Sequence, residues 1–355
     1  MRQCFNWLFC LLLIASPALA EEPTSPASNE ADLPQEDGPA LYVRGLTLMS
    51  GPGRDYRLAA RCFNRAASLG YVPAYTQLGL IHAEGLGVPQ NQAEAYRWYC
   101  LAAQLGDAQG QYLLGQCHAE GLGTPQDYAQ ARHFYEKAAA QNLVQAWTAL
   151  GQLYGEGLGV KRNAREAAAW FRLAAEAGDN QAQYELGLLY QEGSGVKRDA
   201  AEALHWLERA AQGGQVDAMN DLGVMYEKGQ GVKADRQQAL KWYRQAADRG
   251  DAAAQYNLAA LLGKTGPADS REVVELFRCA ADQGFAPAQL SLGVRYVLGA
   301  GVEADLVQAW VWFSLAAAGG EEKAQNCLDE LRGSLKPEEI ILAQRLVKQR
   351  QALMN

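Results

Sequence analysis

Cysteine is scarce in this sequence and follows no metal-binding or disulfide pattern. Only five of the seven cysteines lie beyond residue 20, namely Cys62, Cys100, Cys117, Cys279 and Cys327. An odd, scattered set without a CxxC pair predicts neither a disulfide framework nor a zinc site. Cys100 and Cys117 fall on consecutive predicted helices, so one bridge is open to them in an oxidising compartment, and two packed free thiols are the alternative.

Positive charge and catalytic motifs are also lacking. The chain has 32 Lys and Arg against 40 Asp and Glu, a formal net charge of −8. An acidic chain without a basic face argues against nucleic-acid binding. The sequence contains no HExxH, no Ser-x-x-Lys and no phosphate-binding loop, so we expect no catalytic activity, no cofactor and no metal.

Long apolar runs are absent after the first 20 residues, which argues against membrane insertion of the mature chain. Arg2, an apolar run over residues 7–14 and an Ala-x-Ala site ending at Ala20 predict a signal peptide over residues 1–20, cleaved before Glu21. We therefore expect a periplasmic or secreted protein. Residues 21–39 are rich in proline and acids and poor in large apolar residues, which predicts a flexible acidic leader.

A repeat organises the rest of the chain. Gly79, Gly115, Gly151, Gly187 and Gly223 follow one another at steps of 36 residues. The next step reaches Ala259, and Gly293 follows after 34 residues, because the turn between them is shorter. Strict self-similarity at such a period predicts stacked copies of one supersecondary unit.

Each copy contains two amphipathic helices joined by a glycine turn. An Asp or Asn stands where it can cap the second helix, at Asp55, Asn91, Asp127, Asn163, Asp199, Asp235, Asp269 and Asp305. A large residue then occupies a predicted core position before an Ala pair or its equivalent, at Cys62, Trp98, Phe134, Trp170, Trp206, Trp242, Leu276 and Trp312. We expect the Ala pair to let helices approach and this large residue to fill the remaining space.

This pattern resembles the Sel1-like repeat, a relative of the tetratricopeptide repeat. The resemblance implies an all-α, right-handed superhelical solenoid of about eight helix pairs over residues 40–320. Residues 321–355 continue with a further first helix and a last helix, which predicts a C-terminal cap. His82 and His118 occupy a position that is tyrosine in other copies, so we interpret them as packing residues.

By the same resemblance, the first helices line the concave side. The position three residues before the repeat glycine would face that side, at Thr76, Tyr112, Thr148, Tyr184, Asn220, Tyr256 and Leu290. Tyrosine combines a rigid apolar ring with a polar tip, so we predict protein contacts at Tyr112, Tyr184, Asn220 and Tyr256. The alternative is that this position packs on the next helix.

A second series precedes the first turn glycine. It consists of Glu84, Glu120, Glu156 and Glu192, and the same position then changes to Lys228 and Lys264. A glutamate at a helix C-terminus is disfavoured by the helix dipole. We predict an acidic strip followed by basic positions, suited to a partner of opposite polarity, with pairing to turn cations or simple solvation as the alternatives.

The resemblance implies a non-enzymatic protein-binding scaffold or adaptor that acts through its concave face. Sel1-like proteins serve in envelope signalling, complex assembly and host interaction, and one group binds secretory immunoglobulin A. We expect a monomer with one or more protein partners. The alternative is an envelope enzyme of the β-lactam-binding or β-lactam-hydrolysing Sel1-like type, but those proteins carry a spaced cysteine pair in each repeat, and this sequence does not.

Overall fold

The computed structural model describes residues 36–354 except for residues 52 and 265–269. The signal-peptide segment 1–20 and residues 21–35 of the leader lie outside this part of the chain. The described residues form eighteen α-helices and no strand, which confirms the all-α prediction. The helices are α1 Gly38–Ser50, α2 Tyr56–Ser68, α3 Val72–Glu84, α4 Gln92–Gln104, α5 Ala108–Glu120, α6 Tyr128–Ala139, α7 Val144–Glu156, α8 Ala164–Glu176, α9 Asn180–Glu192, α10 Ala200–Gln212, α11 Val216–Lys228, α12 Arg236–Ala247, α13 Ala252–Gly263, α14 Arg271–Asp282, α15 Ala286–Leu298, α16 Leu306–Ala318, α17 Glu322–Arg332 and α18 Pro337–Met354.

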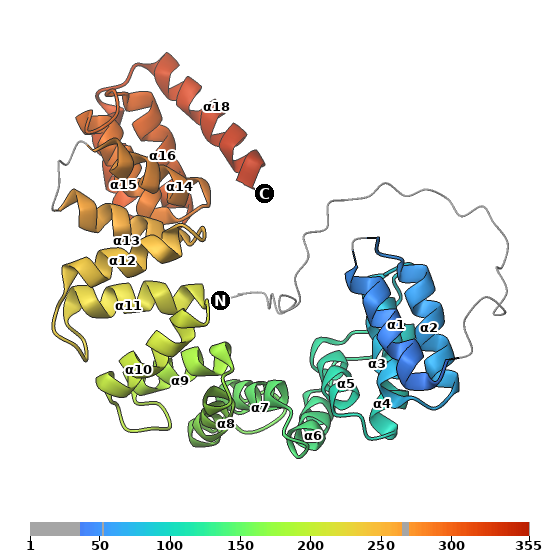
Figure 1. Ribbon diagram of the computed structural model, residues 1–355. Coiled ribbons are helices and arrows are strands. Elements are labelled where there is room, and N and C mark those ends of the chain that lie inside the picture. The colour runs from blue at the N-terminus through green and yellow to red at the C-terminus, as the bar shows by residue number, and fades with distance from the viewer. Residues whose placement is uncertain (1–35, 52, 265–269, 355) are drawn as a thin grey trace, which may run out of the picture.

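The helices stack as consecutive pairs into a curved solenoid. Nearly all helix contacts join neighbours in the sequence, as expected when each repeat buries its apolar surface against the next. The first helices α5, α7 and α9 line the inner side of the curve, whereas their partners α6, α8 and α10 lie outside (Figure 1). The solenoid prediction, and the inner position expected for these first helices, are thus confirmed.

Side-chain caps define where the second helices begin. In seven copies the predicted residue accepts a hydrogen bond from a backbone amide of the first turn, at Asp55, Asn91, Asp127, Asn163, Asp199, Asp235 and Asp305. Such a cap satisfies an amide that has no partner within the helix. The eighth predicted cap, Asp269, lies outside the described residues.

The two helices of a pair meet at the repeat glycine. At this point a large side chain from the second helix lies directly against the glycine of the first. These contacts join Gly45 to Phe63, Gly79 to Tyr99, Gly115 to Tyr135, Gly151 to Phe171, Gly187 to Leu207, Gly223 to Tyr243 and Gly293 to Phe313. All seven large side chains are buried, so this contact is the centre of each pair.

The position of the large core residue requires a correction. The sequence predicted that the residue at Trp206 and its equivalents fills the space beside the Ala pair. The interface between the two helices of a repeat is filled instead by the next residue in the sequence. For example, Leu207 packs against Gly187. Trp206 of α10 packs instead in a cluster with Phe171 of α8 and Leu186 of α9. The tryptophan position therefore joins adjacent repeats.

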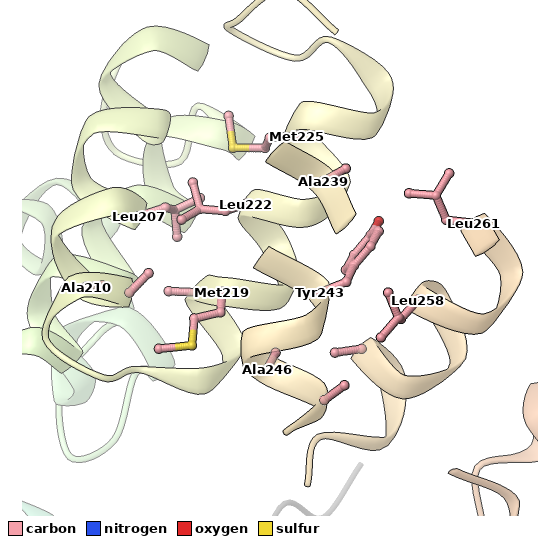
Figure 2. Packing of buried hydrophobic residues seen from close by; sticks show 14 of the residues in the cluster. Leu207, Ala210, Met219, Leu222, Met225, Ala239, Tyr243, Ala246, Leu258 and Leu261 are labelled. Atoms are coloured by element: carbon pink, nitrogen blue, oxygen red, sulfur yellow. The ribbon is translucent and has the colours of Figure 1, made fainter. Parts of the chain in front are cut away.

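Figure 2 shows the core that α10 to α13 share. Tyr243 of α12 is 1% exposed and lies near Leu258 of α13, while Leu222 of α11 faces Leu207 of α10. The same cluster therefore joins residues of three consecutive repeats, and burial of its apolar surface stabilises both the helix pairs and their stacking.

The last two helices cover the end of the array. Ala324 and Leu328 of α17 are buried in the positions of Ala288 and Leu292, as the sequence predicted. Helix α18 then packs on α16 through the buried Ala343. The guanidinium of Arg350 lies 4.2 Å from the ring centroid of Trp312 and pairs with Asp282 at 2.9 Å. None of the described helices combines the length and apolarity needed to cross a membrane.

The glycine contact leads to a test of stability. A Cβ atom at Gly151 would lie 2.7 Å from Cδ1 of Phe171, so Gly151→Ala is expected to lower the free energy of unfolding by about 1–3 kcal/mol through overpacking. Gly333→Ala is the control, because a Cβ there meets no atom within 4 Å. Urea denaturation followed by circular dichroism measures both. Adding Phe171→Leu to Gly151→Ala should restore part of the lost stability. Equal denaturation midpoints for Gly151→Ala and Gly333→Ala would contradict the role of the contact.

Candidate protein-binding groove on the inner face

A groove of about 310 Å³ opens where α5, α7 and the turn before α6 meet. Its walls come from α5, α6, α7 and their turns, and from Asp179, the N-cap residue of α9. The residues that line it are Tyr112, Gln116, Ala119, Glu120, Gln126, Tyr128, Tyr135, Gln145, Thr148, Ala149, Gln152, Leu153, Leu158 and Asp179. Helices α5 and α7 are neighbours on the inner side of the solenoid, so the groove faces the concave surface (Figure 1).

Two of the eight residues proposed from the sequence line this groove, Tyr112 and Glu120. The ring of Tyr112 packs on Tyr135, with 5.6 Å between the ring centroids. Burial raises the pKa of the Tyr112 hydroxyl, and the nearby carboxylates of Glu120 and Asp179 raise it further. The hydroxyl of Tyr112 therefore remains protonated at neutral pH and stays available as a hydrogen-bond donor.

Tyr184, Asn220 and Tyr256 lie outside the groove and join adjacent inner helices. Tyr184 donates a hydrogen bond to Asp221 across 3.2 Å. Asn220 accepts one from the side-chain amide of Asn257 at 2.9 Å. The ring of Tyr256 packs against Phe277 and Phe285, with centroid distances of 5.8 and 5.5 Å. All three side chains stay half-buried, so a role in partner contact remains a prediction.

The four glutamates of the predicted acidic strip occupy the last position of α3, α5, α7 and α9. Glu84, Glu120, Glu156 and Glu192 are all exposed, and each precedes a glycine in the left-handed conformation. Within the described part of the chain none of them lies within ion-pair distance of a cation. The turn residue Arg162 donates to the Gly155 carbonyl at 2.9 Å instead. Lys264 pairs with Glu227 at 3.2 Å.

A further group of acids lies between the inner helices α9, α11 and α13. Burial raises the pKa of Asp221 to about 6, the hydrogen bond from Tyr184 lowers it, and the negative charges of Asp217 and Asp251 raise it. Burial also raises the pKa of Glu185 and of Asp217. The inner face of the middle repeats is thus acidic and partly dehydrated.

Sequence reasoning missed most of the polar groove. Gln116, Gln145, Gln152 and Asp179 all line it and were not singled out. One signal was available in the sequence. The position after the repeat glycine is apolar in six copies, at Leu46, Leu80, Leu188, Val224, Ala260 and Val294. Only Gln116 and Gln152 replace that apolar residue by an amide, and both belong to the groove.

The histidines and cysteines make no catalytic constellation in the described residues. His118 is 9% exposed and stacks on Phe134 with an interplanar angle of 4°, which confirms its packing role. Burial lowers its pKa. Cys100 and Cys117 are free thiols in the structure, and burial raises the pKa of both. No group of three His, Cys, Asp or Glu side chains between residues 36 and 354, outside the gaps, could hold a metal ion.

Comparison with known proteins identifies the repeat. The family model of the Sel1 repeat matches eight consecutive segments, residues 38–71, 72–107, 108–143, 146–179, 180–215, 216–251, 252–285 and 286–321. The chain belongs to the Sel1 repeat family. A Sel1 repeat protein from Oxalobacter formigenes is similar in structure, with 34% identity, a TM-score of 0.64, and coverage of 83% of this chain and 86% of that one.

A second similar structure is c5321, a protective antigen present in uropathogenic Escherichia coli strains that displays an SLR fold. It is 32% identical to this Sel1 repeat chain and has a TM-score of 0.48. The match covers 88% of this chain and 84% of c5321. No curated protein matches the chain. Solenoids of the Sel1 and tetratricopeptide type are typically non-catalytic scaffolds that bind protein partners.

The raised pKa of Asp221 predicts a pH-dependent stability. The carboxyl group ionises near 3.8 in the unfolded chain and at about 6 in the folded one, so it costs stability as the pH rises through 6. Asp221→Asn keeps an acceptor for Tyr184 and is expected to raise the free energy of unfolding at pH 8 by on the order of 1 kcal/mol, and by less at pH 4. Thermal melts at the two pH values measure this. A stabilisation that is equal at both would contradict the assignment.

Proposed function

We propose that this Sel1 repeat protein is an exported scaffold that binds a protein partner on its inner face. The observation that carries the proposal is the groove between α5 and α7, which gathers unpaired polar side chains on the concave side of a solenoid. One of the four exposed glutamates, Glu120 at the end of α5, lines this groove. A preformed concave surface with aromatic and polar groups suits a partner segment better than a small reacting molecule.

The rigidity of the scaffold supports binding without large rearrangement. Seven of the first helices are held by a glycine contact, and buried clusters that span neighbouring repeats add to this. A surface that is already ordered loses little conformational entropy when a partner binds, and this favours affinity. The exposed Glu156 and Glu192 would add electrostatic attraction to a basic partner and raise its association rate.

The export part of the proposal rests on the pattern of residues 1–20, which lie outside the described residues. We place the scaffold in the periplasm or the medium. Within that setting we propose a role in envelope signalling, complex assembly or host interaction.

Photo-crosslinking tests the binding face. Replacing Gln152, which lines the groove, with p-benzoylphenylalanine is expected to give crosslinked protein adducts in the native envelope or medium. The matched control places the same residue at Ala169, an exposed position on the outer helix α8 of the same repeat. Adducts should form from position 152 and be much weaker from position 169. Equal adducts from both positions, or none from position 152, would contradict binding on the inner face.

Export has a separate test. Expressed in a bacterial host of the appropriate kind, the chain is expected to accumulate outside the cytoplasm with Glu21 as its first residue. Fractionation followed by intact-mass measurement identifies the N-terminus. The substitution Ala20→Glu should block cleavage, because the site requires a small residue. Accumulation of the uncleaved wild-type chain in the cytoplasm would remove the export part of the proposal.

A further inference from the structure

The groove between α5 and α7 carries negative charge and no cationic side chain. Its two charged lining residues are Glu120 and Asp179, and no lysine or arginine of the described chain lines it. Both residues line the groove together with Tyr112, and both carboxylates raise the pKa of the Tyr112 hydroxyl. Although Glu120 as a whole residue is exposed, desolvation beside the groove raises the pKa of its carboxyl, so the ionised form is disfavoured there. A cation placed there would relieve this cost.

The rest of the groove offers hydrogen bonds that the protein itself does not use. The side-chain amides of Gln116, Gln145 and Gln152 have no hydrogen-bond partner among the described residues, although all three line the groove. Thr148 is only 4% exposed, and its hydroxyl reaches the Val144 carbonyl at 3.5 Å, at the limit for such a bond. Amide and hydroxyl groups of this kind match the alternating donors and acceptors of a peptide main chain.

We propose that this groove binds an extended peptide segment with one lysine or arginine, whose side chain lies between Glu120 and Asp179. The main chain of that segment is held by Gln116, Gln145 and Gln152, and Tyr112 contacts the aliphatic part of the basic side chain. This inference rests on the proposed function, since it specifies the chemistry of the partner at the same site.

The size of the groove favours a single extended strand. Its volume of about 310 Å³ is at the lower end for ligand sites and suits one side chain with its adjoining main chain. A helix, about 10–12 Å across with its side chains, would present side chains alone to the glutamines. The chain's own leader is excluded as the occupant by its charge, because residues 21–39 contain six acids and no lysine or arginine.

Defined peptide pools test the charge preference. Acetylated and amidated undecamers carry lysine, norleucine or glutamate at the centre, with mixtures of Ala, Ser, Thr, Val and Asn on both sides. They are passed over the immobilised chain of residues 21–355, and the retained fraction is measured. The lysine pool is expected to be retained at least fivefold more than the norleucine pool and the glutamate pool least. The preference should decrease as salt is raised from 50 to 500 mM.

Variants then locate the preference. The double variant Glu120→Gln and Asp179→Asn should abolish it while preserving the fold, because asparagine also caps helices and Asp179 caps α9 through Ala182. Glu192→Gln is the matched control, since Glu192 holds the same helix position as Glu120 but does not line the groove. Circular dichroism melts verify folding. Equal retention of the lysine and norleucine pools, or an undiminished preference in the folded double variant, would overturn the inference.

The two proposals fail differently. If adducts still form from position 152 but the lysine pool shows no preference, the inner face binds a partner of another chemistry and only this inference is overturned. If position 152 gives no adducts and the lysine pool shows no preference, both are overturned. A preference that disappears equally in the Glu192→Gln control would show a general effect of negative charge and would also overturn the assignment to this groove.

Discussion

The close contact between a glycine of one helix and a large side chain of its partner determines the geometry of the whole array. In seven copies the inner helix can approach its partner because the glycine has no Cβ, and a buried aromatic ring or leucine then fills the interface. Cores of this kind tolerate little change in volume. The contact recurs at an almost constant step, so each pair is placed on the last in nearly the same way, and the inner helices form one continuous face.

The fold could be predicted from the sequence in considerable detail. The recurring glycines and capping residues are consequences of backbone geometry, and such requirements appear directly in the sequence. The capping role was correct for Asp127 and Asp199 among others. The prediction failed at the tryptophan position, because tryptophan is the larger and more conspicuous side chain. Its neighbour, such as Tyr135 or Phe171, is the one directed into the pair. When two adjacent residues both face neighbouring helices, periodicity alone does not show which of them packs within the helix pair.

The site was less predictable. The sequence pointed to Tyr112 and Glu120, which line the groove, and also to Tyr184, Asn220 and Tyr256, which bond or pack across to the next repeat. A periodic position occupied in every copy cannot show which copy has open space beside it. That depends on the side chains that adjacent helices supply, including Asp179, which lines the groove from the N-cap of α9. The departure from the repeat at Gln116 and Gln152 was the more informative signal.

Helices of this protein contact mainly their neighbours in the sequence. The groove and the length of the concave face therefore depend on different parts of the chain. The groove depends on the repeats that contain α5 to α9, whereas the length of the concave face depends on how many repeats follow. Duplication or loss of a distant helix pair would therefore alter the reach of the protein without disturbing this groove. A lineage of such proteins could keep one recognition element unchanged while partners of different size came to occupy the remainder of the surface.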